Sequence, residues 1–193
     1  MTLVVLWALL ATPELLVEVP ERIPTALVEL KYATDDNFMK KQVYPTGARC
    51  LLLERTLKRL AQAAQALAAQ GYRLKLYDCY RPQSVQVELW KNQPRPGYVM
   101  DPQKGSTHSR GTAVDLTLVT RDGAPIEMPS AYDFFGKAAH HGYAGGPPAA
   151  RAHRDALRTA MEAAGFKPNP LEWWHYELLD AWSAPVRDEP VVP

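Results

Sequence analysis

The sequence predicts an α+β fold in one domain, with a small antiparallel sheet and flanking helices. Helical and strand patterns are mixed along the chain without the regular strand–helix alternation of a parallel sheet. Its 193 residues suffice for one domain with its own core. The apolar fraction of 47% and the charged fraction of 22% are those of an ordinary soluble protein, and the 17 prolines favour irregular connections.

The individual elements follow from periodicity. Leucines recur at three- and four-residue steps over residues 51–70, before Gly71, which predicts the clearest helix. Two further helices are expected at 82–93 and 149–164. Strand patterns occupy 73–80, 111–119 and 174–179. Loops with short strands are expected over 13–49, and 132–141 fits neither periodicity.

The two ends of the chain differ from its middle. We expect an N-terminal segment at 1–24, a domain at 25–183 and a loose Pro-rich tail at 184–193. The apolar start is too short to span a bilayer, so no stable membrane span is expected. It resembles the apolar part of a signal peptide, without a basic leader or clear cleavage site. The alternatives are a mis-called start, a signal remnant, a first strand or a disordered end.

Charge and cysteine content narrow the function classes. Lys and Arg together number 22 and Asp and Glu together 21, which leaves a net charge of +1 and no footprint for sequence-independent nucleic-acid binding. The two cysteines, Cys50 and Cys79, are compatible with one disulfide or with two buried thiols. Nothing in the sequence indicates an oligomeric state.

Two short segments carry the residues of a metal site. His108, Asp115 and His175 offer two imidazoles and a carboxylate, and Glu172 adds a carboxylate three residues before the last histidine. Two or three such ligands with an open position suit catalytic zinc. His108 and Asp115 are seven residues apart and would face opposite sides of one strand, unless Gly111 breaks its regularity. Each motif alone is weak, since a surface His–Asp hydrogen bond or a lone Glu-x-x-His is common. Together they predict a site at the mouth of an antiparallel sheet.

The motifs around these residues resemble the zinc D-Ala-D-Ala dipeptidases of vancomycin-resistance clusters (VanX-type) and their relatives. The family pattern Ser-x-His-x-x-Gly-x-Ala-x-Asp is complete from 106 to 115, and Glu-Trp-Trp-His stands at 172–175. Further similar stretches are LKYATDDNF at 30–38, YDCYRP at 77–82 and YDFF at 132–135. The resemblance covers about residues 28–180 in the family's order. It implies the small α+β fold shared by Hedgehog N-domains and D,D-peptidases.

The resemblance also implies the roles of the metal-site residues. His108, Asp115 and His175 are expected to hold one zinc ion per chain, with a water in the fourth position. Glu172 is expected to act as general base and acid, and Arg81 to stabilise the negative charge of the transition state. For Arg81 the alternative is a structural ion pair, for example with Asp78.

Three further residues are expected to contact a small zwitterionic dipeptide. Asp133 matches the family residue for the substrate ammonium. Ser106 is expected to donate to the substrate carboxylate, and Tyr32 to line the pocket. Local roles are the alternatives, with Ser106 as a turn former and Tyr32 as a core aromatic.

The implied function is zinc-dependent hydrolysis of D-Ala-D-Ala, or of a similar D-amino-acid dipeptide, to free D-alanine. A D,D- or L,D-carboxypeptidase acting on peptidoglycan stem peptides would share the zinc site. A non-catalytic zinc-stabilised binding module is the alternative from another class. A Cys50–Cys79 disulfide would join the long helix to the strand that carries Arg81 and would indicate an oxidising compartment. We therefore expect a periplasmic or envelope location, with the cytoplasm as the alternative.

Overall fold

The computed structural model of the chain describes residues 14–192. The apolar start at 1–11, with its expected relation to a signal peptide, lies outside the described residues. The helices are α1 (Val19–Arg22), α2 (Glu54–Ala68), α3 (Gln83–Asn92) and α4 (Pro148–Ala163). The strands are β1 (Leu16–Glu18), β2 (Leu27–Val28), β3 (Leu51–Leu53), β4 (Tyr72–Asp78), β5 (Ala113–Thr120), β6 (Phe166–Pro168) and β7 (His175–Leu178). Short 3-10 turns lie at Lys31–Ala33, His108–Arg110, Lys137–Ala139 and Ala181–Ser183.

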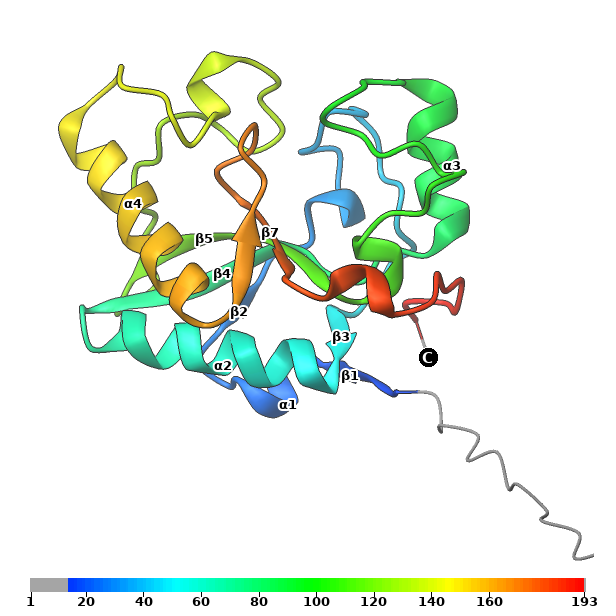
Figure 1. The fold of residues 1–193 in the computed structure, drawn as a ribbon, viewed down its shortest axis with the longest axis horizontal. Helices are drawn as coiled ribbons and strands as arrows, with labels where there is room; N and C mark the ends of the chain where they lie inside the picture. Colours follow the sequence, from blue (N-terminus) through cyan, green and yellow to red (C-terminus); the bar gives the residue numbers. More distant parts are fainter. Residues whose placement is uncertain (1–13, 193) are drawn as a thin grey trace, which may run out of the picture.

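The expected α+β architecture is present (Figure 1). Five strands form the main sheet in the order β2-β4-β5-β7-β6, and β1 pairs with β3 in a second, two-stranded sheet. All neighbours in the main sheet are antiparallel except β2, which runs parallel to β4 at one edge. The long strands β4 and β5 are paired within the main sheet, with β2 on the outer side of β4 and β7 followed by β6 on the outer side of β5.

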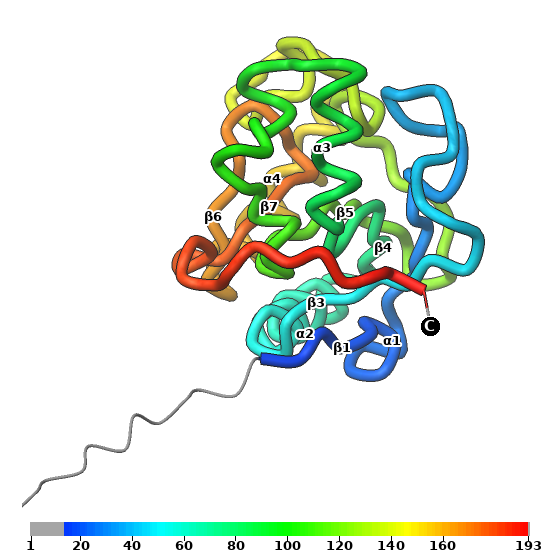
Figure 2. Tube along the Cα trace, turned by 90° about the vertical axis from the view of Figure 1, so that its right-hand side faces the viewer, coloured from blue at the N-terminus to red at the C-terminus, as the bar shows by residue number. Residues whose placement is uncertain are grey.

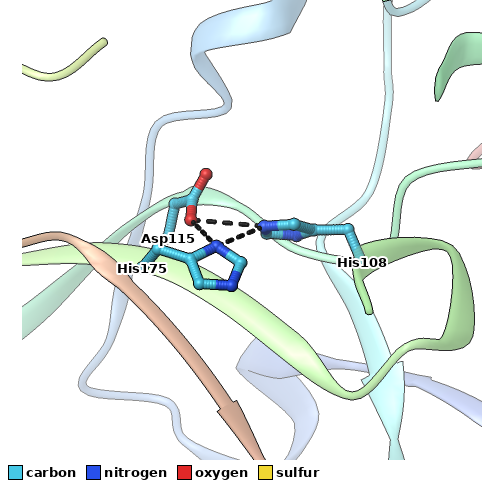
Figure 3. A group of neighbouring side chains, drawn as sticks. All are labelled: His108, Asp115 and His175. Atoms are coloured by element: carbon cyan, nitrogen blue, oxygen red, sulfur yellow. Dashed lines mark hydrogen bonds and ion pairs between the residues drawn. The ribbon is translucent and has the colours of Figure 1, made fainter. Parts of the chain in front are cut away.

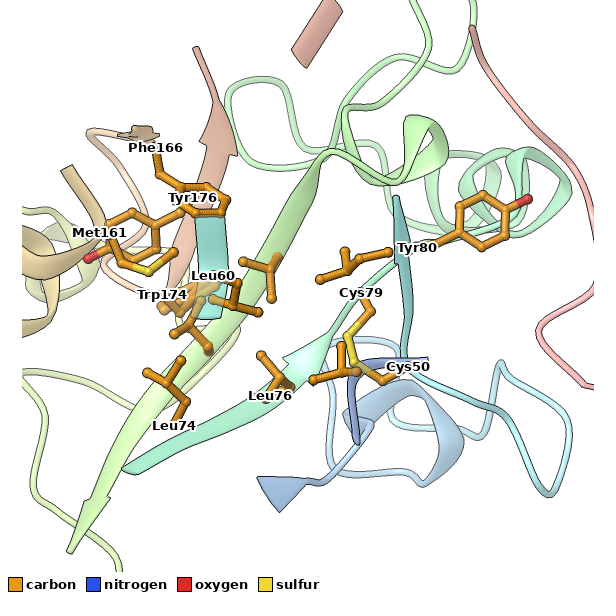
Figure 4. Packing of buried hydrophobic residues seen from close by; sticks show 14 of the residues in the cluster. Cys50, Leu60, Leu74, Leu76, Cys79, Tyr80, Met161, Phe166, Trp174 and Tyr176 are labelled. Carbon is orange, nitrogen blue, oxygen red and sulfur yellow. A yellow bond between two sulfur atoms is a disulfide. The ribbon is translucent and has the colours of Figure 1, made fainter. Parts of the chain in front are cut away.

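The core lies between this sheet and the amphipathic helices α2 and α4. The apolar side of α2 buries Leu57, Leu60 and Leu67 completely, and burial of each such side chain stabilises the fold by about 1.5–3 kcal/mol. Figure 4 shows side chains from the helices and from β4 meeting in this cluster, among them Leu60, Met161 and Leu74. In contrast, α3 lies apart from these two helices, on the other side of the molecule (Figure 1).

One predicted boundary is wrong. The periodicity predicts a helix from residue 51, but Leu51–Leu53 form strand β3 and the helix begins at Glu54. All three leucines are buried, and they pair with β1 in the register Leu16 to Leu53. A strand between β1 and the rest of the core buries consecutive leucines on both of its faces, which a helix with one apolar side does not.

Residues beyond both bounds of the expected domain pack against its body. Residues 16–24 belong to the packed body, because Val19 is fully buried, Ile23 is 5% exposed and β1 pairs with β3. The Pro-rich tail is not loose over its described residues, 184–192. Its Arg187 N–H donates to the Ser109 carbonyl at 2.8 Å, and its Val191 is 2% exposed. Figure 2 shows this C-terminal segment crossing the body beside β3.

A disulfide joins Cys50, just before β3, to Cys79, just after β4. Their Cα atoms lie 5.2 Å apart, and both side chains are buried in the core. The bridge therefore connects the entry to α2 with the end of the central strand β4. Within the described residues, no helix is long and apolar enough to span a membrane.

Candidate active site

The three central strands place three polar residues in one row at the end of the sheet. Asp115 in β5 pairs with Asp78 of β4 on one side and with His175 of β7 on the other. A register irregularity in β4 immediately precedes this row. Because directly opposed residues of neighbouring strands have adjacent side chains, the sheet itself brings these groups together.

His108 reaches the same point from outside the sheet. It begins the 3-10 turn at 108–110, which ends at Gly111 in the left-handed conformation, with φ 69°. A Cβ on Gly111 would lie 2.9 Å from Leu16 Cδ2, so both the backbone conformation and the packing require glycine there. As expected, this glycine separates a loop-borne His108 from a strand-borne Asp115.

The three expected ligands converge (Figure 3). Asp115 Oδ1 lies 3.2 Å from His108 Nε2 and 3.0 Å from His175 Nδ1. The two histidine nitrogens lie 3.1 Å apart. One ligand atom from each residue falls within 4.8 Å of the others, which is the arrangement that a single metal ion requires.

The hydrogen bonds of His108 show that this donor set fits a cation. Its Nδ1 lies 2.8 Å from the carbonyl oxygen of Cys79. A carbonyl only accepts, so Nδ1 carries the hydrogen and Nε2 presents a lone pair to the carboxylate of Asp115. The lone pair of His108 Nε2 and the negative charge of Asp115 face each other, and a positive ion between them would stabilise both. Imidazole and carboxylate donors are among the ligands that zinc takes.

Electrostatics keep the carboxylate of Asp115 ionised. Burial by itself disfavours charge on Asp115, but His108 and then His175 outweigh it and hold the pKa of Asp115 below its usual range. Burial likewise opposes charge on His175, but Asp115, together with Glu177, raises the pKa of that imidazole to about 10, so a metal ion would bind there in exchange for a proton. The carboxylate therefore stays ionised and available as a ligand.

Glu172 lies in the turn before β7, as its spacing from His175 predicts. It is 6% exposed, and its Oε2 accepts a hydrogen bond of 2.6 Å from Asn169 Nδ2. Burial raises the pKa of Glu172 to about 8, while the neighbouring His175 charge opposes the shift and the Asp115 carboxylate adds to it. A carboxyl group tuned close to neutral pH suits both uptake and release of a proton.

Arg81 is held on several sides. Its Nε and Nη2 donate to Asp78 Oδ2 at 2.9 and 2.6 Å, and its Nη1 donates to Gln86 Oε1 at 2.7 Å. The ring of Tyr32 lies 5.1 Å from the guanidinium carbon. Arg81 thus makes the structural ion pair with Asp78 that was the alternative prediction for it. It also lines the cavity at the metal ligands. Tyr32 packs beneath Arg81 and lines that cavity too.

Asp133 lies on the loop at 132–141. This loop contains one 3-10 turn and is otherwise irregular. Its φ of 56° is unusual for a residue other than glycine. Asp133 Oδ2 accepts a hydrogen bond of 3.1 Å from the Phe38 N–H. Burial raises the pKa of Asp133 to about 7, against the effect of that hydrogen bond.

One cavity of about 490 Å³ connects these groups. Ser106 lines it and at the same time accepts a 3.2 Å hydrogen bond from the His108 N–H, so its local role in the turn is present. The candidate residues that line the cavity are Tyr32, Arg81, Ser106, His108, Asp115, Asp133, Glu172 and His175. Every expected metal, catalytic and substrate-binding residue therefore faces the same space.

Three supporting residues escape sequence reasoning. Asn169 holds the carboxyl group of Glu172, Gln86 holds Arg81, and the Tyr132 hydroxyl donates to Asp115 Oδ2 at 2.9 Å. Asn169 precedes a proline, which is a turn signal and could have drawn attention to it. For Gln86 and Tyr132, the surrounding sequence does not indicate which residue each side chain contacts.

The two adjacent histidines of the long loop have separate surroundings. His140 Nε2 lies 3.0 Å from the Tyr98 hydroxyl. His141 is buried, and its N–H donates to the Pro170 carbonyl, which ties the loop to the turn that carries Glu172. Both therefore support the walls of the site.

Comparisons of this chain with known proteins point to one family. The family model Peptidase_M15, described as D-ala-D-ala dipeptidase, matches residues 14–190. A D-alanyl-D-alanine dipeptidase of Escherichia coli (strain K12) is 40% identical over 171 residues, with 89% of this chain and 88% of that protein covered. Proteins of the same name from Enterococcus faecalis and Streptomyces coelicolor are 36% and 35% identical, each with 79% of this chain and 85% of the relative covered.

Proposed function

Since this chain belongs to the peptidase M15 family of D-Ala-D-Ala dipeptidases, we propose that it hydrolyses D-Ala-D-Ala, or a similar D-amino-acid dipeptide, with one zinc ion per chain. The observation that carries the proposal is the single cavity lined by the His108–Asp115–His175 group, by Glu172 and by Arg81. A non-catalytic binding module has no need of a buried carboxyl group beside the metal ligands.

His108 Nε2, Asp115 Oδ1 and His175 Nδ1 would hold the zinc ion. When bound, zinc supplies Lewis acidity for the peptide carbonyl and lowers the pKa of water at its open position. The carbonyl of Cys79 keeps the hydrogen of His108 on Nδ1, so that the other nitrogen faces the ligand group.

Glu172 is the proposed general base and acid. Its carboxylate takes a proton from the attacking water and then delivers it to the amine that leaves as the peptide bond breaks. Asn169 holds one carboxyl oxygen in place, and burial keeps the proton affinity high enough for this transfer.

Arg81 is the proposed stabiliser of the transition state. Attack on the peptide carbonyl places negative charge on its oxygen, and a fixed guanidinium stabilises that charge in a site that excludes water. Asp78 and Gln86 hold the guanidinium before the substrate arrives, so little reorganisation is needed during the reaction.

The remaining polar groups suit the two ends of a free dipeptide. Asp133 provides a negative charge for the substrate ammonium, and Ser106 provides a hydroxyl for its carboxylate. A free dipeptide offers both ends in a small molecule, whereas a stem peptide carries no ammonium at the corresponding position.

Turnover of D-Ala-D-Ala and of its N-acetylated form tests the proposal. We expect D-alanine release from the free dipeptide and at least a hundredfold lower kcat/KM for the acetylated form. Equal or faster cleavage of the acetylated form would instead favour the carboxypeptidase alternative. Binding without any hydrolysis of either compound would favour the binding module.

We also propose a periplasmic or envelope location. The Cys50–Cys79 pairing supports it, because disulfides persist in oxidising compartments. Thiol titration of the protein from its native host should find no free thiol after denaturation. Two titratable thiols in protein trapped directly from cells would indicate the cytoplasm.

A further inference from the structure

A second hollow of about 300 Å³ lies beside the candidate active-site cavity. Three residues line both spaces, namely Phe38, Asp133 and Phe135. A residue that lines two cavities separates them. These three residues therefore form the wall between the two spaces, and one of them, Asp133, is the residue proposed to bind the substrate ammonium.

The wall is built from two aromatic rings around a carboxylate. The rings of Phe38 and Phe135 meet edge to face with their centroids 5.2 Å apart. The Phe38 N–H donates to Asp133, and the Phe135 ring packs against Tyr98 with centroids 5.0 Å apart. Arg95 lies over the same Phe135 ring, with its guanidinium carbon 5.0 Å from the centroid. These contacts hold both rings in place.

We propose that Phe38 and Phe135 are specificity-determining residues that close the pocket behind the amino end of the substrate. This proposal rests on the proposed function, with Asp133 bound to the ammonium of a dipeptide. An acyl group on that nitrogen removes the positive charge and extends the molecule into the space that the two rings occupy. The wall thus restricts the site to substrates with a free amino end.

Two cations and two carboxylates line the hollow behind the wall, and one of the carboxylates is that of Asp133, which also faces the active-site cavity. Lys40 and Arg95 line it, and both are exposed. The carboxylate of Asp36, which also lines it, pairs with Lys31. An acyl group that ends in a carboxylate would therefore meet cations once the wall is opened. N-succinyl-D-Ala-D-Ala has such a group and is the suitable probe.

The chain offers a matched control for opening the wall. Phe134 is the neighbour of Phe135 and is 48% exposed, and it lines the hollow without lining the active-site cavity. Phe135→Ala joins the two spaces, whereas Phe134→Ala only enlarges the hollow. Both changes remove the same number of atoms from the same loop.

The experiment measures kcat/KM for N-succinyl-D-Ala-D-Ala and for D-Ala-D-Ala on each zinc-loaded protein. The ratio of the two values on one preparation is independent of the fraction of folded enzyme. We expect Phe135→Ala to raise this ratio at least tenfold over wild type, which is the scale of discrimination that a filled apolar space provides. Phe134→Ala should leave the ratio within about twofold of wild type. If circular dichroism shows that Phe135→Ala does not fold, Phe38→Ala is measured in its place, since Phe38 contacts Asp133 through its main chain.

An unchanged ratio in the wall variant, or an equal rise in Phe134→Ala, would overturn the proposal. A failure of the proposed function would look different. In that case the wild-type protein itself would release no D-alanine from D-Ala-D-Ala. Equal cleavage of the succinylated compound by wild type would overturn both proposals.

Discussion

The two ends of the candidate pocket are built in different ways. At the metal end, Asp115 and His175 are paired across strands, and the neighbouring His108 is fixed by a main-chain carbonyl. At the amino end, Asp133 and the aromatic wall lie on loops and are held by ring packing and one hydrogen bond. Under the proposed function, the metal end would determine whether chemistry occurs, and the amino end would determine which molecule is accepted. Substitutions at the two ends should therefore separate kcat from KM.

The largest effect is expected for Glu172→Gln at the metal end. The amide keeps the size of the side chain and its contact with Asn169 but no longer accepts a proton. We expect kcat for D-Ala-D-Ala to fall by about a thousandfold. The bound zinc content, measured by elemental analysis, should stay at one per chain. Unchanged turnover in a folded, zinc-loaded variant would show that Glu172 is not the base.

A smaller loss is expected for Arg81→Lys. Lysine keeps the positive charge but loses the planar fork that Asp78 and Gln86 hold. We expect kcat to fall by about a hundredfold, with KM changed by less than about threefold. Steady-state kinetics at saturating zinc measures both constants. A rise in KM alone would place Arg81 in ground-state binding and would weaken the contrast between the two ends.

At the amino end the effect should appear in KM and should depend on pH. Burial raises the pKa of Asp133 to about 7, so its ionised form is lost as the pH falls through that value. Because only the carboxylate attracts the substrate ammonium, KM for D-Ala-D-Ala should rise below about pH 7. Asp133→Asn should raise KM about tenfold or more at pH 8 and remove this dependence of KM on pH. A KM in the variant that still rises on acidification would contradict the assignment.

The smallest effect on turnover is expected from removal of the disulfide. Cys50→Ala combined with Cys79→Ala should lower the free energy of unfolding by about 2–4 kcal/mol. Alanine keeps the main-chain carbonyl at residue 79 that orients His108, but the bridge no longer fixes the position of that carbonyl. Zinc affinity should therefore fall, while turnover at saturating zinc changes by less than about tenfold. Competition with a chelator measures the affinity.

Leu67→Ala is the control for this variant. Leu67 is fully buried at the other end of α2, so its truncation costs a similar amount of stability, about 2–5 kcal/mol, away from the site. If both variants lost zinc affinity equally, the bridge would act only through global stability.

The metal end and the amino end also differ in how much of their structure can be predicted from the sequence alone. Residues at the metal end lie in motifs with a chemical meaning, so His108, Asp115, Glu172 and His175 could be singled out, together with the role of Gly111. The long helices were also predictable, because burial of one side of α2 or α4 requires apolar residues at regular three- and four-residue steps in the sequence.

Features that depend on distant partners were not predictable. β1 is three residues long and becomes a strand only because β3 lies beside it. Val191 is buried, and its carbonyl accepts a hydrogen bond from the main-chain N–H of Arg49, more than a hundred residues earlier in the chain. Gln86 carries no local pattern, and the YDFF stretch that includes Phe135 does not reveal which residues it contacts, since both roles arise from segments that the fold brings together.

The most direct test of the central claim is a zinc titration of metal-depleted protein, with release of D-alanine from D-Ala-D-Ala as the readout. We expect no turnover after chelation and recovery that reaches its maximum at one zinc per chain. A His175→Ala variant should fail to recover under the same titration. Full activity in protein shown by elemental analysis to hold no metal would contradict the zinc-dependent mechanism.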